Sequence, residues 1–305
     1  FDHATEEFIK VIHYAATQSN IPFMSIKVTG LVRFGLLETV DAGMNAIDGS
    51  LMNRYNAVLA SLLDHEKEEW KKVIERITKI CQAGAEKNIG VLVDAEETWI
   101  QDPVDALTIL MMDSFNKSKA VVYNTMQLYR HDRLAFLKDS YEAAVQRNFI
   151  LGAKLVRGAY MEKERKRAIE KKYASPIQPT KESTDKDYND AVEFGIEHIA
   201  KIAIIVASHN EESNLLATKI LDKKQLPHNH PHIHFSQLYG MSDNITFNLA
   251  KSGCSVSKYL PFGPIEDVIP YLMRRAQENS SVSGQMGREL GLIKKETARR
   301  KISSK

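Results

Sequence analysis

Two adjacent arginines, Arg274 and Arg275, are the residues of this chain best suited to bind a small anion. They lie in Tyr271-Leu272-Met273-Arg274-Arg275-Ala276-Gln277-Glu278-Asn279, whose apolar spacing predicts an amphipathic helix. Neighbouring helix positions point about 100° apart, so both guanidinium groups can grip one anion if the helix borders a pocket. A carboxylate fits best, because each planar fork offers it paired N–H donors. Taken alone, the pair is better explained as solvated surface charges, and other segments of the chain change this balance.

Polar residues also recur where predicted β-strands end. The strands and the residues at their carboxyl ends are 23–28 with Lys27, 89–95 with Asp94, 120–126 followed by Gln127, 150–156 with Lys154 and followed by Arg157, 202–208 followed by His209 and Asn210, 232–237 followed by Leu238, and 255–260 with Tyr259. One such residue is usually a cap or closes a loop. The recurrence over seven strands indicates groups that meet a ligand or one another.

The elements that position these residues alternate along the chain. Helical patterns occupy residues 65–87, 132–147, 185–201, 211–224 and 264–279. Residues 36–64 read as helices after the first strand, and residues 162–187 as a long, highly charged connection. This alternation predicts a parallel sheet covered by helices, closed as a distorted (βα)₈ TIM-type barrel with one strand not placed. No Pro-, Gly- or Ser-rich linker appears, so residues 1–305 are expected to form one domain.

Composition limits the classes of function. The chain has 305 residues, 43% hydrophobic residues and a net charge of +2, which describes a globular protein and gives no reason to expect a nucleic-acid partner. Cys81 and Cys254 are the two cysteines, and their separation offers no metal-ligand or redox spacing. No apolar run approaches the ~20 residues of a membrane-spanning helix.

Three features bear on cofactors and metals. Lys154 and Arg157 place two cations at one strand end, and Gly158 then allows close backbone approach, which suits phosphate. Neither a Gly-x-Gly-x-x-Gly turn nor a P-loop occurs, so the barrel mouth would have to hold a dinucleotide. The four alternating histidines between residues 228 and 234 are interrupted by Pro231 and lack a Cys or carboxylate, so no metal site is predicted.

Several ordered segments resemble the proline dehydrogenase family. They are Lys154-Leu155-Val156-Arg157-Gly158-Ala159-Tyr160, Ala207-Ser208-His209-Asn210, Gln237-Leu238-Tyr239-Gly240-Met241, Lys258-Tyr259-Leu260-Pro261-Phe262-Gly263 and the segment with the arginine pair. The resemblance covers residues 23 to 279, and residues 39–61 are its least family-like part. It implies a barrel that holds FAD without covalent attachment and oxidises L-proline to 1-pyrroline-5-carboxylate by hydride transfer to the flavin.

The resemblance also implies roles for individual residues. In this view Arg274, Arg275 and Lys27 bind the proline carboxylate, and Asp94 orients this polar network. Tyr160, Leu238 and Tyr259 are expected to wall the pyrrolidine ring. The residues expected at the cofactor are Gln127 at the flavin ring, Lys154, Arg157 and Gly158 near the pyrophosphate, and His209, Asn210 and Glu278 at the remaining polar edges.

The resemblance further implies a quinone as electron acceptor, peripheral membrane contact, and a separate pyrroline-5-carboxylate dehydrogenase for the next step. The compartment it favours is the bacterial cytoplasm beside the inner membrane, with the mitochondrial inner membrane or matrix as the alternative. A hydroxyproline dehydrogenase is the nearest alternative function, although the bulk of Tyr259 favours proline. The other alternative is a non-catalytic barrel that binds amino acids. A metal-dependent hydrolase would need more ligands than Asp94 and His209.

Overall fold

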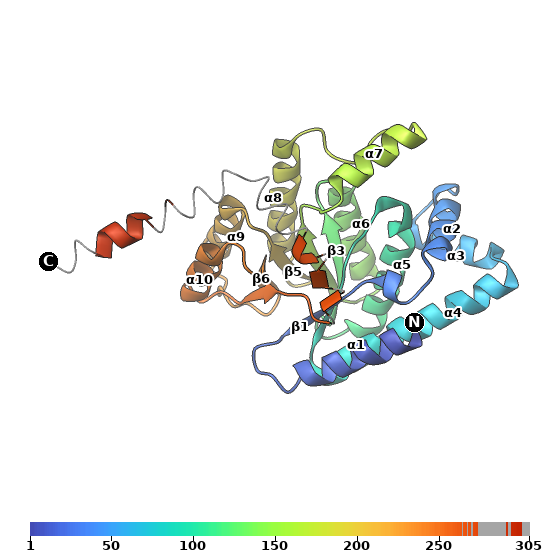
Figure 1. The fold of residues 1–305 in the computed structure, drawn as a ribbon, viewed down its shortest axis with the longest axis horizontal. Helices are drawn as coiled ribbons and strands as arrows, with labels where there is room; N and C mark the ends of the chain where they lie inside the picture. The colour runs from blue at the N-terminus through green and yellow to red at the C-terminus, as the bar shows by residue number, and fades with distance from the viewer. Residues whose placement is uncertain (264, 267, 270, 274–290, 292–293, 301–305) are drawn as a thin grey trace. The chain divides into compact units, whose positions relative to one another are not determined.

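The computed structural model describes residues 1–263, 265–266, 268–269, 271–273, 291 and 294–300 (Figure 1). Within these residues the strands are β1 Phe23–Ile26, β2 Gly90–Val93, β3 Val122–Gln127, β4 Leu151–Val156, β5 Ile202–Ala207, β6 Ile233–Leu238 and β7 Val256–Tyr259. The α-helices are α1 Asp2–Ala15, α2 Phe34–Asn45, α3 Leu51–Ser61, α4 Asp64–Lys87, α5 Gln101–Phe115, α6 Arg133–Gln146, α7 Met161–Lys171, α8 Lys181–Glu197, α9 Glu211–Lys223 and α10 Asp243–Lys251. Two short 3₁₀ helices are η1 Val28–Gly30 and η2 Thr98–Ile100.

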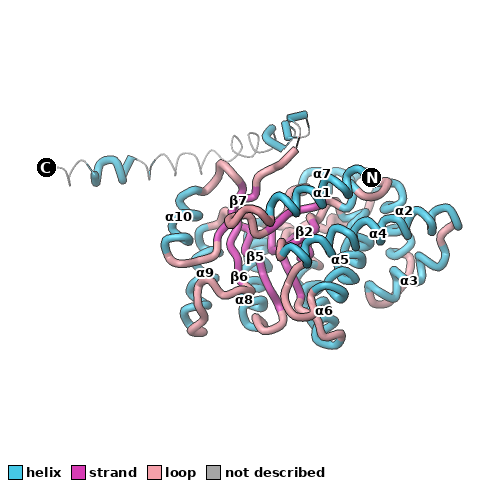
Figure 2. Tube along the Cα trace, turned by 90° about the horizontal axis from the view of Figure 1, so that it is seen from below, coloured by secondary structure: helices cyan, strands magenta, loops and turns pink. Residues whose placement is uncertain are grey.

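All seven predicted strands form a single sheet in sequence order, from β1 to β7. The pairs from β1 to β6 are parallel, with Met24 opposite Val91 and Gln127 opposite Val156. Helices lie outside the curled sheet (Figures 1 and 2). The predicted α/β architecture of the (βα)₈ type is therefore confirmed, and the described residues contribute seven of its strands.

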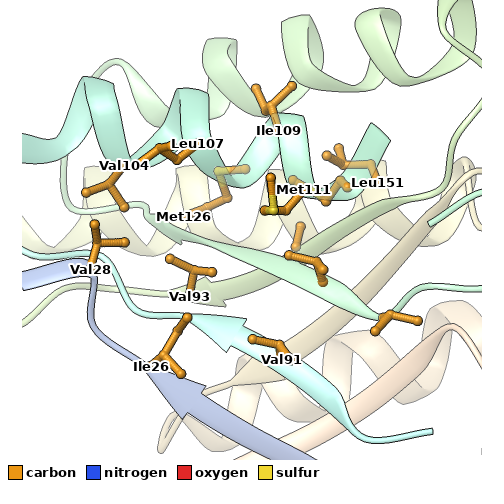
Figure 3. Packing of buried hydrophobic residues seen from close by; sticks show 14 of the residues in the cluster. Ile26, Val28, Val91, Val93, Val104, Leu107, Ile109, Met111, Met126 and Leu151 are labelled. Atoms are coloured by element: carbon orange, nitrogen blue, oxygen red, sulfur yellow. The ribbon is translucent and has the colours of Figure 1, made fainter. Parts of the chain in front are cut away.

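The main core lies between the strands and their covering helices. Strand β2 is buried on both faces, as expected for a parallel strand enclosed by other elements. Figure 3 shows Val104 and Leu107 of α5 facing Val93 and Met126 of the sheet. These four side chains are at most 1% exposed. Such packing fixes the strand ends, and with them the polar residues that follow.

Residues 39–61, the least family-like part of the sequence, fold as most of α2 together with α3. Helix α3 is attached to α4 by the hydrogen bond from Trp70 Nε1 to Tyr55 Oη, at 2.8 Å. Both aromatic side chains are at most 2% exposed. Helices α2 and α3 also pack against α5, and α2 packs against η2, so the segment is an integral part of the helical layer.

One predicted element is wrong. Residues 162–187 were expected to be a charged connection, but they contain nearly all of α7 and the start of α8. Helix α8 begins earlier than predicted because Thr180 caps it, with its side chain accepting a hydrogen bond from Ser183 N. The predicted helix at residues 264–279 lies largely outside the described residues.

The chain divides into two compact units, residues 1–258 and residues 259–305. The first contains nearly all of the sheet and the hydrophobic core. In the second, the rings of Tyr259 and Tyr271 lie with their centroids 6.1 Å apart. Within the described part of the chain, none of the helices combines the length and hydropathy that crossing a bilayer requires.

Candidate active site

Lys27 connects three strand ends through its ammonium group. It directly follows β1, and its Nζ donates to Glu96 Oε2 at 3.3 Å and to Tyr160 Oη at 3.1 Å. Glu96 lies in the loop after β2, and Tyr160 lies after β4. The side chain of Lys27 keeps 45% of its surface exposed, whereas that of Glu96 keeps 11%. A partly accessible ammonium group is therefore held between two partners at the carboxyl edge of the sheet.

The charge of Lys27 is stabilised by its surroundings. Burial by itself disfavours the charged form, but attraction by Glu96, supported by Tyr160 and Asp94, outweighs this effect and raises the pKa of Lys27 above its ordinary value. The amine is thus an ammonium group at neutral pH. In this form it can bind an anion.

Asp94 and Lys154 form an ion pair close to Lys27. Asp94 follows β2 and its backbone N–H donates to Ile26 O at 2.8 Å, which ties it to β1. Lys154 lies within β4 and is only 7% exposed. The structure therefore brings together Lys27, Asp94, Lys154 and Tyr160 at this edge of the sheet.

Glu96 is a central residue that the sequence reasoning missed. Its carboxylate accepts from Thr29 Oγ1 at 2.8 Å as well as from Lys27. Its carbonyl accepts from Gln127 Nε2 at 2.8 Å, and its N–H donates to Gln101 Oε1 at 3.0 Å. Gln127 therefore joins the same group. The only available signal was the run of acidic residues Asp94, Glu96 and Glu97 directly after a buried strand.

The backbone of Glu96 rests on a fully buried polar network. Gln101 Nε2 donates to Asp105 Oδ1 at 2.8 Å, and Arg133 Nη1 donates to Asp105 Oδ2 at 2.7 Å. Burial raises the pKa of Asp105 despite the nearby Arg133 guanidinium. This network fixes the loop after β2 through the hydrogen bond from Glu96 N to Gln101.

Arg157 is held by groups of the protein itself. Its guanidinium donates to Asp185 Oδ1 at 2.7 Å, Ser208 Oγ at 2.8 Å and Ser213 Oγ at 3.0 Å. It also stacks over the ring of Tyr188, 4.3 Å from the centroid. Arg157 thus connects the ends of β4 and β5, so any anion that it binds must share it with these partners.

The structure explains the glycine at position 158 by packing, whereas the sequence suggested an approach of the backbone to phosphate. Its φ of +137° is unfavourable for residues with a side chain, and an added Cβ would lie 2.4 Å from the ring of Tyr129. Close packing on Tyr129 alone therefore requires glycine here. A role in backbone approach to phosphate remains a prediction.

His209, Asn210 and Leu238 lie where β5 and β6 end. Leu238 N donates to His209 Nε2 at 3.4 Å, and His209 Nδ1 lies 2.9 Å from Ser242 Oγ. Asn210 caps α9, since its Oδ1 accepts from Ser213 N at 3.0 Å. His209 therefore links the two strand ends, while part of Asn210 serves the helix.

Four predicted residues lie outside the part of the chain in which this group is described. Tyr259 belongs to the second unit, which is described by itself. Arg274, Arg275 and Glu278 lie outside the described residues. The roles assigned to these four residues from the sequence stay predictions, as do those of the residues above.

The alternating histidines bind protein groups. His228 Nε2 lies 2.8 Å from Asp222 Oδ1, and His232 Nδ1 lies 2.6 Å from Ile199 O. His234 packs edge-on against Phe23, and burial lowers its pKa to about 4. No cluster of three or more His, Cys, Asp or Glu side chains suited to a metal ion occurs among the described residues.

The chemistry of the donor set at the strand ends fits a phosphate-containing cofactor with a polar ring. Lys154 and Arg157 supply cationic N–H donors suited to a pyrophosphate. Gln127 supplies an amide that can both donate to and accept from a ring edge. All three residues lie at the carboxyl ends of β3 and β4, the edge where parallel α/β sheets bind ligands.

Comparison with known proteins identifies relatives of this chain. The family model for proline dehydrogenase matches residues 1–288. The chain is 34% identical to the mitochondrial proline dehydrogenase 1 of Dictyostelium discoideum, over 98% of this chain and 57% of the relative. It is 32% identical to the hydroxyproline dehydrogenase of Xenopus laevis, over 95% of this chain and 65% of the relative. The chain thus spans little more than half of the first of these proteins and less than two thirds of the second.

A solved structure shares the fold. Proline utilization A (PutA) from Bdellovibrio bacteriovorus superimposes with a TM-score of 0.76 at 21% identity, covering 92% of this chain and 28% of that chain. The structural likeness thus extends over nearly all of the sequence. The family model, which spans almost the whole chain, shows that this protein belongs to the proline dehydrogenase family.

Proposed function

We propose that this chain oxidises L-proline to 1-pyrroline-5-carboxylate with bound FAD, and that residues 1–305 act as one barrel domain. Family membership supports the reaction. The observation that carries the proposal is the Lys27 ammonium group, which is partly exposed, kept charged and held beside Tyr160 at the carboxyl edge of the sheet. Proline offers one permanent anion and one apolar ring, and this corner provides a cation beside an aromatic ring.

The substrate site would combine the arginine pair with this corner. Arg274 and Arg275 would bind the carboxylate of proline, with Lys27 assisting. Asp94 would orient the ammonium groups of Lys154 and Lys27. Tyr160, Leu238 and Tyr259 are the residues that we assign to the walls of the ring pocket. The backbone of Leu238 is tied to His209, which supports a fixed wall there.

The cofactor would lie along the ends of β3, β4 and β5. We assign Gln127 to the flavin ring, Lys154, Arg157 and Gly158 to the pyrophosphate region, and His209, Asn210 and Glu278 to the other polar edges. Because Asn210 Oδ1 is used by the α9 cap, its Nδ2 group is the part assigned to the cofactor. Bound flavin would supply the two-electron acceptor that proline oxidation needs.

The residues of the chain would orient the substrate. Oxidation removes a hydride from the ring carbon beside nitrogen and a proton from nitrogen, leaving a carbon–nitrogen double bond. The ring nitrogen must therefore be neutral before hydride leaves. Lys27 and the arginines would hold the carboxylate so that this carbon stays in a fixed position, and the aromatic walls would exclude water.

We further propose that the electrons pass to a quinone through peripheral membrane contact, and that a separate pyrroline-5-carboxylate dehydrogenase consumes the product. The compartment that we propose is the bacterial cytoplasm beside the inner membrane. The mitochondrial inner membrane or matrix is the alternative, and the name of the Dictyostelium relative supports it. Release of the protein from sedimented membranes by salt, in a cell that respires on proline, tests the contact.

An anaerobic absorption spectrum of the purified protein tests the main proposal. L-Proline should bleach the visible flavin bands, and trans-4-hydroxy-L-proline at the same concentration should bleach them more slowly. Bleaching by hydroxyproline alone would move the assignment to a hydroxyproline dehydrogenase. A protein that neither contains nor takes up flavin, yet binds proline in calorimetry, would be an amino-acid-binding barrel.

A further inference from the structure

Helix α7 is attached to the loop after β2 by contacts with three successive residues of that loop, Glu97, Thr98 and Trp99. Lys163 forms an ion pair with Glu97. Trp99 has Arg167 over its ring at 4.1 Å and Lys163 at 5.6 Å from the centroid. Thr98, between them, contacts Glu164. We call these contacts the α7 clamp.

Glu164 is the buried member of the α7 clamp. Its side chain is 0% exposed. Oε1 accepts from Thr98 N and Oε2 accepts from Thr98 Oγ1, both at 2.7 Å. A buried carboxylate is costly unless its oxygens are hydrogen-bonded, and in the described part of the chain no ion pair supplies Glu164 with a cation. Its two bonds to one residue make a short, rigid connection.

This connection closes a ring of contacts around Lys27. Thr98 lies two residues after Glu96, and Glu164 lies four residues after Tyr160. The N–H of Glu164 donates to Tyr160 O at 2.9 Å, so Tyr160 is fixed to the same turn. Glu96 and Tyr160 are the two partners of the Lys27 ammonium group. The Thr98–Glu164 contact therefore joins the two segments that hold Lys27.

We propose that Glu164 is a positioning residue for proline binding. It sets the spacing between the Glu96 carboxylate and the Tyr160 hydroxyl, and thereby the position of Lys27 Nζ. The inference rests on the proposed function, in which Lys27 assists in binding the substrate carboxylate. A catalytic group that shifts by about 1 Å can lose roughly a hundredfold in rate or affinity, so a second residue that fixes it should have a measurable effect.

The side-chain chemistry provides a matched pair of variants. Glu164→Ala removes both hydrogen bonds. Glu164→Gln keeps both, because its Oε1 can accept from Thr98 N while its Nε2 donates to Thr98 Oγ1. If position is what matters, Glu164→Ala should raise KM for proline about tenfold, with kcat changed less than threefold, and Glu164→Gln should stay near wild type. Glu162→Ala, in the same turn but exposed, should behave as wild type.

The measurement is steady-state turnover of the FAD-loaded protein over a range of proline concentrations, with a soluble dye as electron acceptor, and hydrogen–deuterium exchange at residues 94–99 is the second readout. Faster exchange at Thr98 together with the split between KM and kcat supports the proposal. An unchanged KM in Glu164→Ala overturns it and leaves the proposed function intact. Equal losses in Glu164→Ala and Glu164→Gln also overturn it, because they would point to the charge.

Two controls keep the outcome clear. If Glu164→Ala fails to fold, Thr98→Val serves instead, since it removes the hydroxyl donor and leaves the backbone donor; an unchanged KM there overturns the proposal. If proline does not reduce the wild-type protein, the proposed function fails and the inference falls with it. In Glu164→Ala, a fall in kcat as large as the rise in KM, together with a lowered Tm, would show that Glu164 has a structural role only. This result would also overturn the proposal.

Discussion

Lys27 contacts Glu96 and Tyr160, and we propose that its charge also helps to bind the proline carboxylate. A mutation that removes the charge tests this second role. Lys27→Met keeps the length of the side chain but removes the charge. We expect KM for proline to rise about 10- to 100-fold, because a hydrogen bond to a charged group contributes about 1.5–3 kcal/mol. Steady-state kinetics of the FAD-loaded enzyme checks this. Lys10→Met, at an exposed site on α1, is the control, and an equal KM in both variants would contradict the role.

Gly158 tests packing at the same strand end. Gly158→Ala would combine an unfavourable positive φ with a Cβ 2.4 Å from the Tyr129 ring, so the free energy of unfolding should fall by about 2–4 kcal/mol. Gly240→Ala shares the positive φ, of +77°, but meets no atom within 4 Å, and should lose about 1 kcal/mol. Urea unfolding of both variants gives the comparison. Equal losses would show that Tyr129 moves aside.

At the residue scale, the sequence predicted part of the site. Lys27, Asp94 and Lys154 were found because a charged residue at the end of an apolar strand is unusual and needs a partner. Glu96 and Glu164 were missed because each lies among other charged residues, where a buried carboxylate looks like a solvated one. Their importance depends on hydrogen bonds to Thr29, Gln101 and Thr98, and the sequence pattern carries no information on these contacts.

At the scale of elements, strands were predicted well and α7 was not. A parallel strand enclosed on both faces is a short continuous apolar run, and β2 and β5 have this pattern. Helix α7 buries only Glu164 and Ala168. It therefore lacks the apolar stripe by which a helix is found in a sequence. The α7 clamp holds it through charged and aromatic contacts instead.

The attachment of α2 to α5 should make stability depend on pH. Asp41 accepts from Asp102 N at 3.1 Å. Burial, and then the carboxylate of Asp102, raise the pKa of Asp41 from 3.8 to about 7. Because the folded pKa is the higher one, the contribution of this group is complete below pH 3.8 and is lost as pH rises through about 7.

Asp41→Asn cannot ionise and should escape this loss. Relative to wild type, its free energy of unfolding should gain about 1–3 kcal/mol between pH 5 and pH 8. Urea unfolding at both pH values measures the gain. Asp48→Asn, an exposed carboxylate of the same segment, should show none. Parallel pH curves for Asp41→Asn and wild type would contradict the assignment of this loss to Asp41.

At the scale of the molecule, the first compact unit should fold without the second. Residues 1–258 contain the main hydrophobic core, so a chain that ends at Lys258 should unfold cooperatively and keep its far-UV circular dichroism. It lacks Tyr259, Arg274 and Arg275, so we expect no measurable proline oxidation. The full-length chain under the same conditions is the control. Loss of cooperativity would show that residues 259–305 are needed to complete the core.

The order of the strands has a consequence for biosynthesis. Each strand of the sheet pairs with its predecessor in the sequence, so the sheet can grow from β2 onward as the polypeptide leaves the ribosome. β1 cannot pair at once, because the three helices α2, α3 and α4 lie between it and β2 in the sequence. Lys27 follows β1, whereas Glu96 follows β2. The contact between them therefore depends on the longest loop closure between neighbouring strands, and the nascent chain must complete three helices before this corner can assemble.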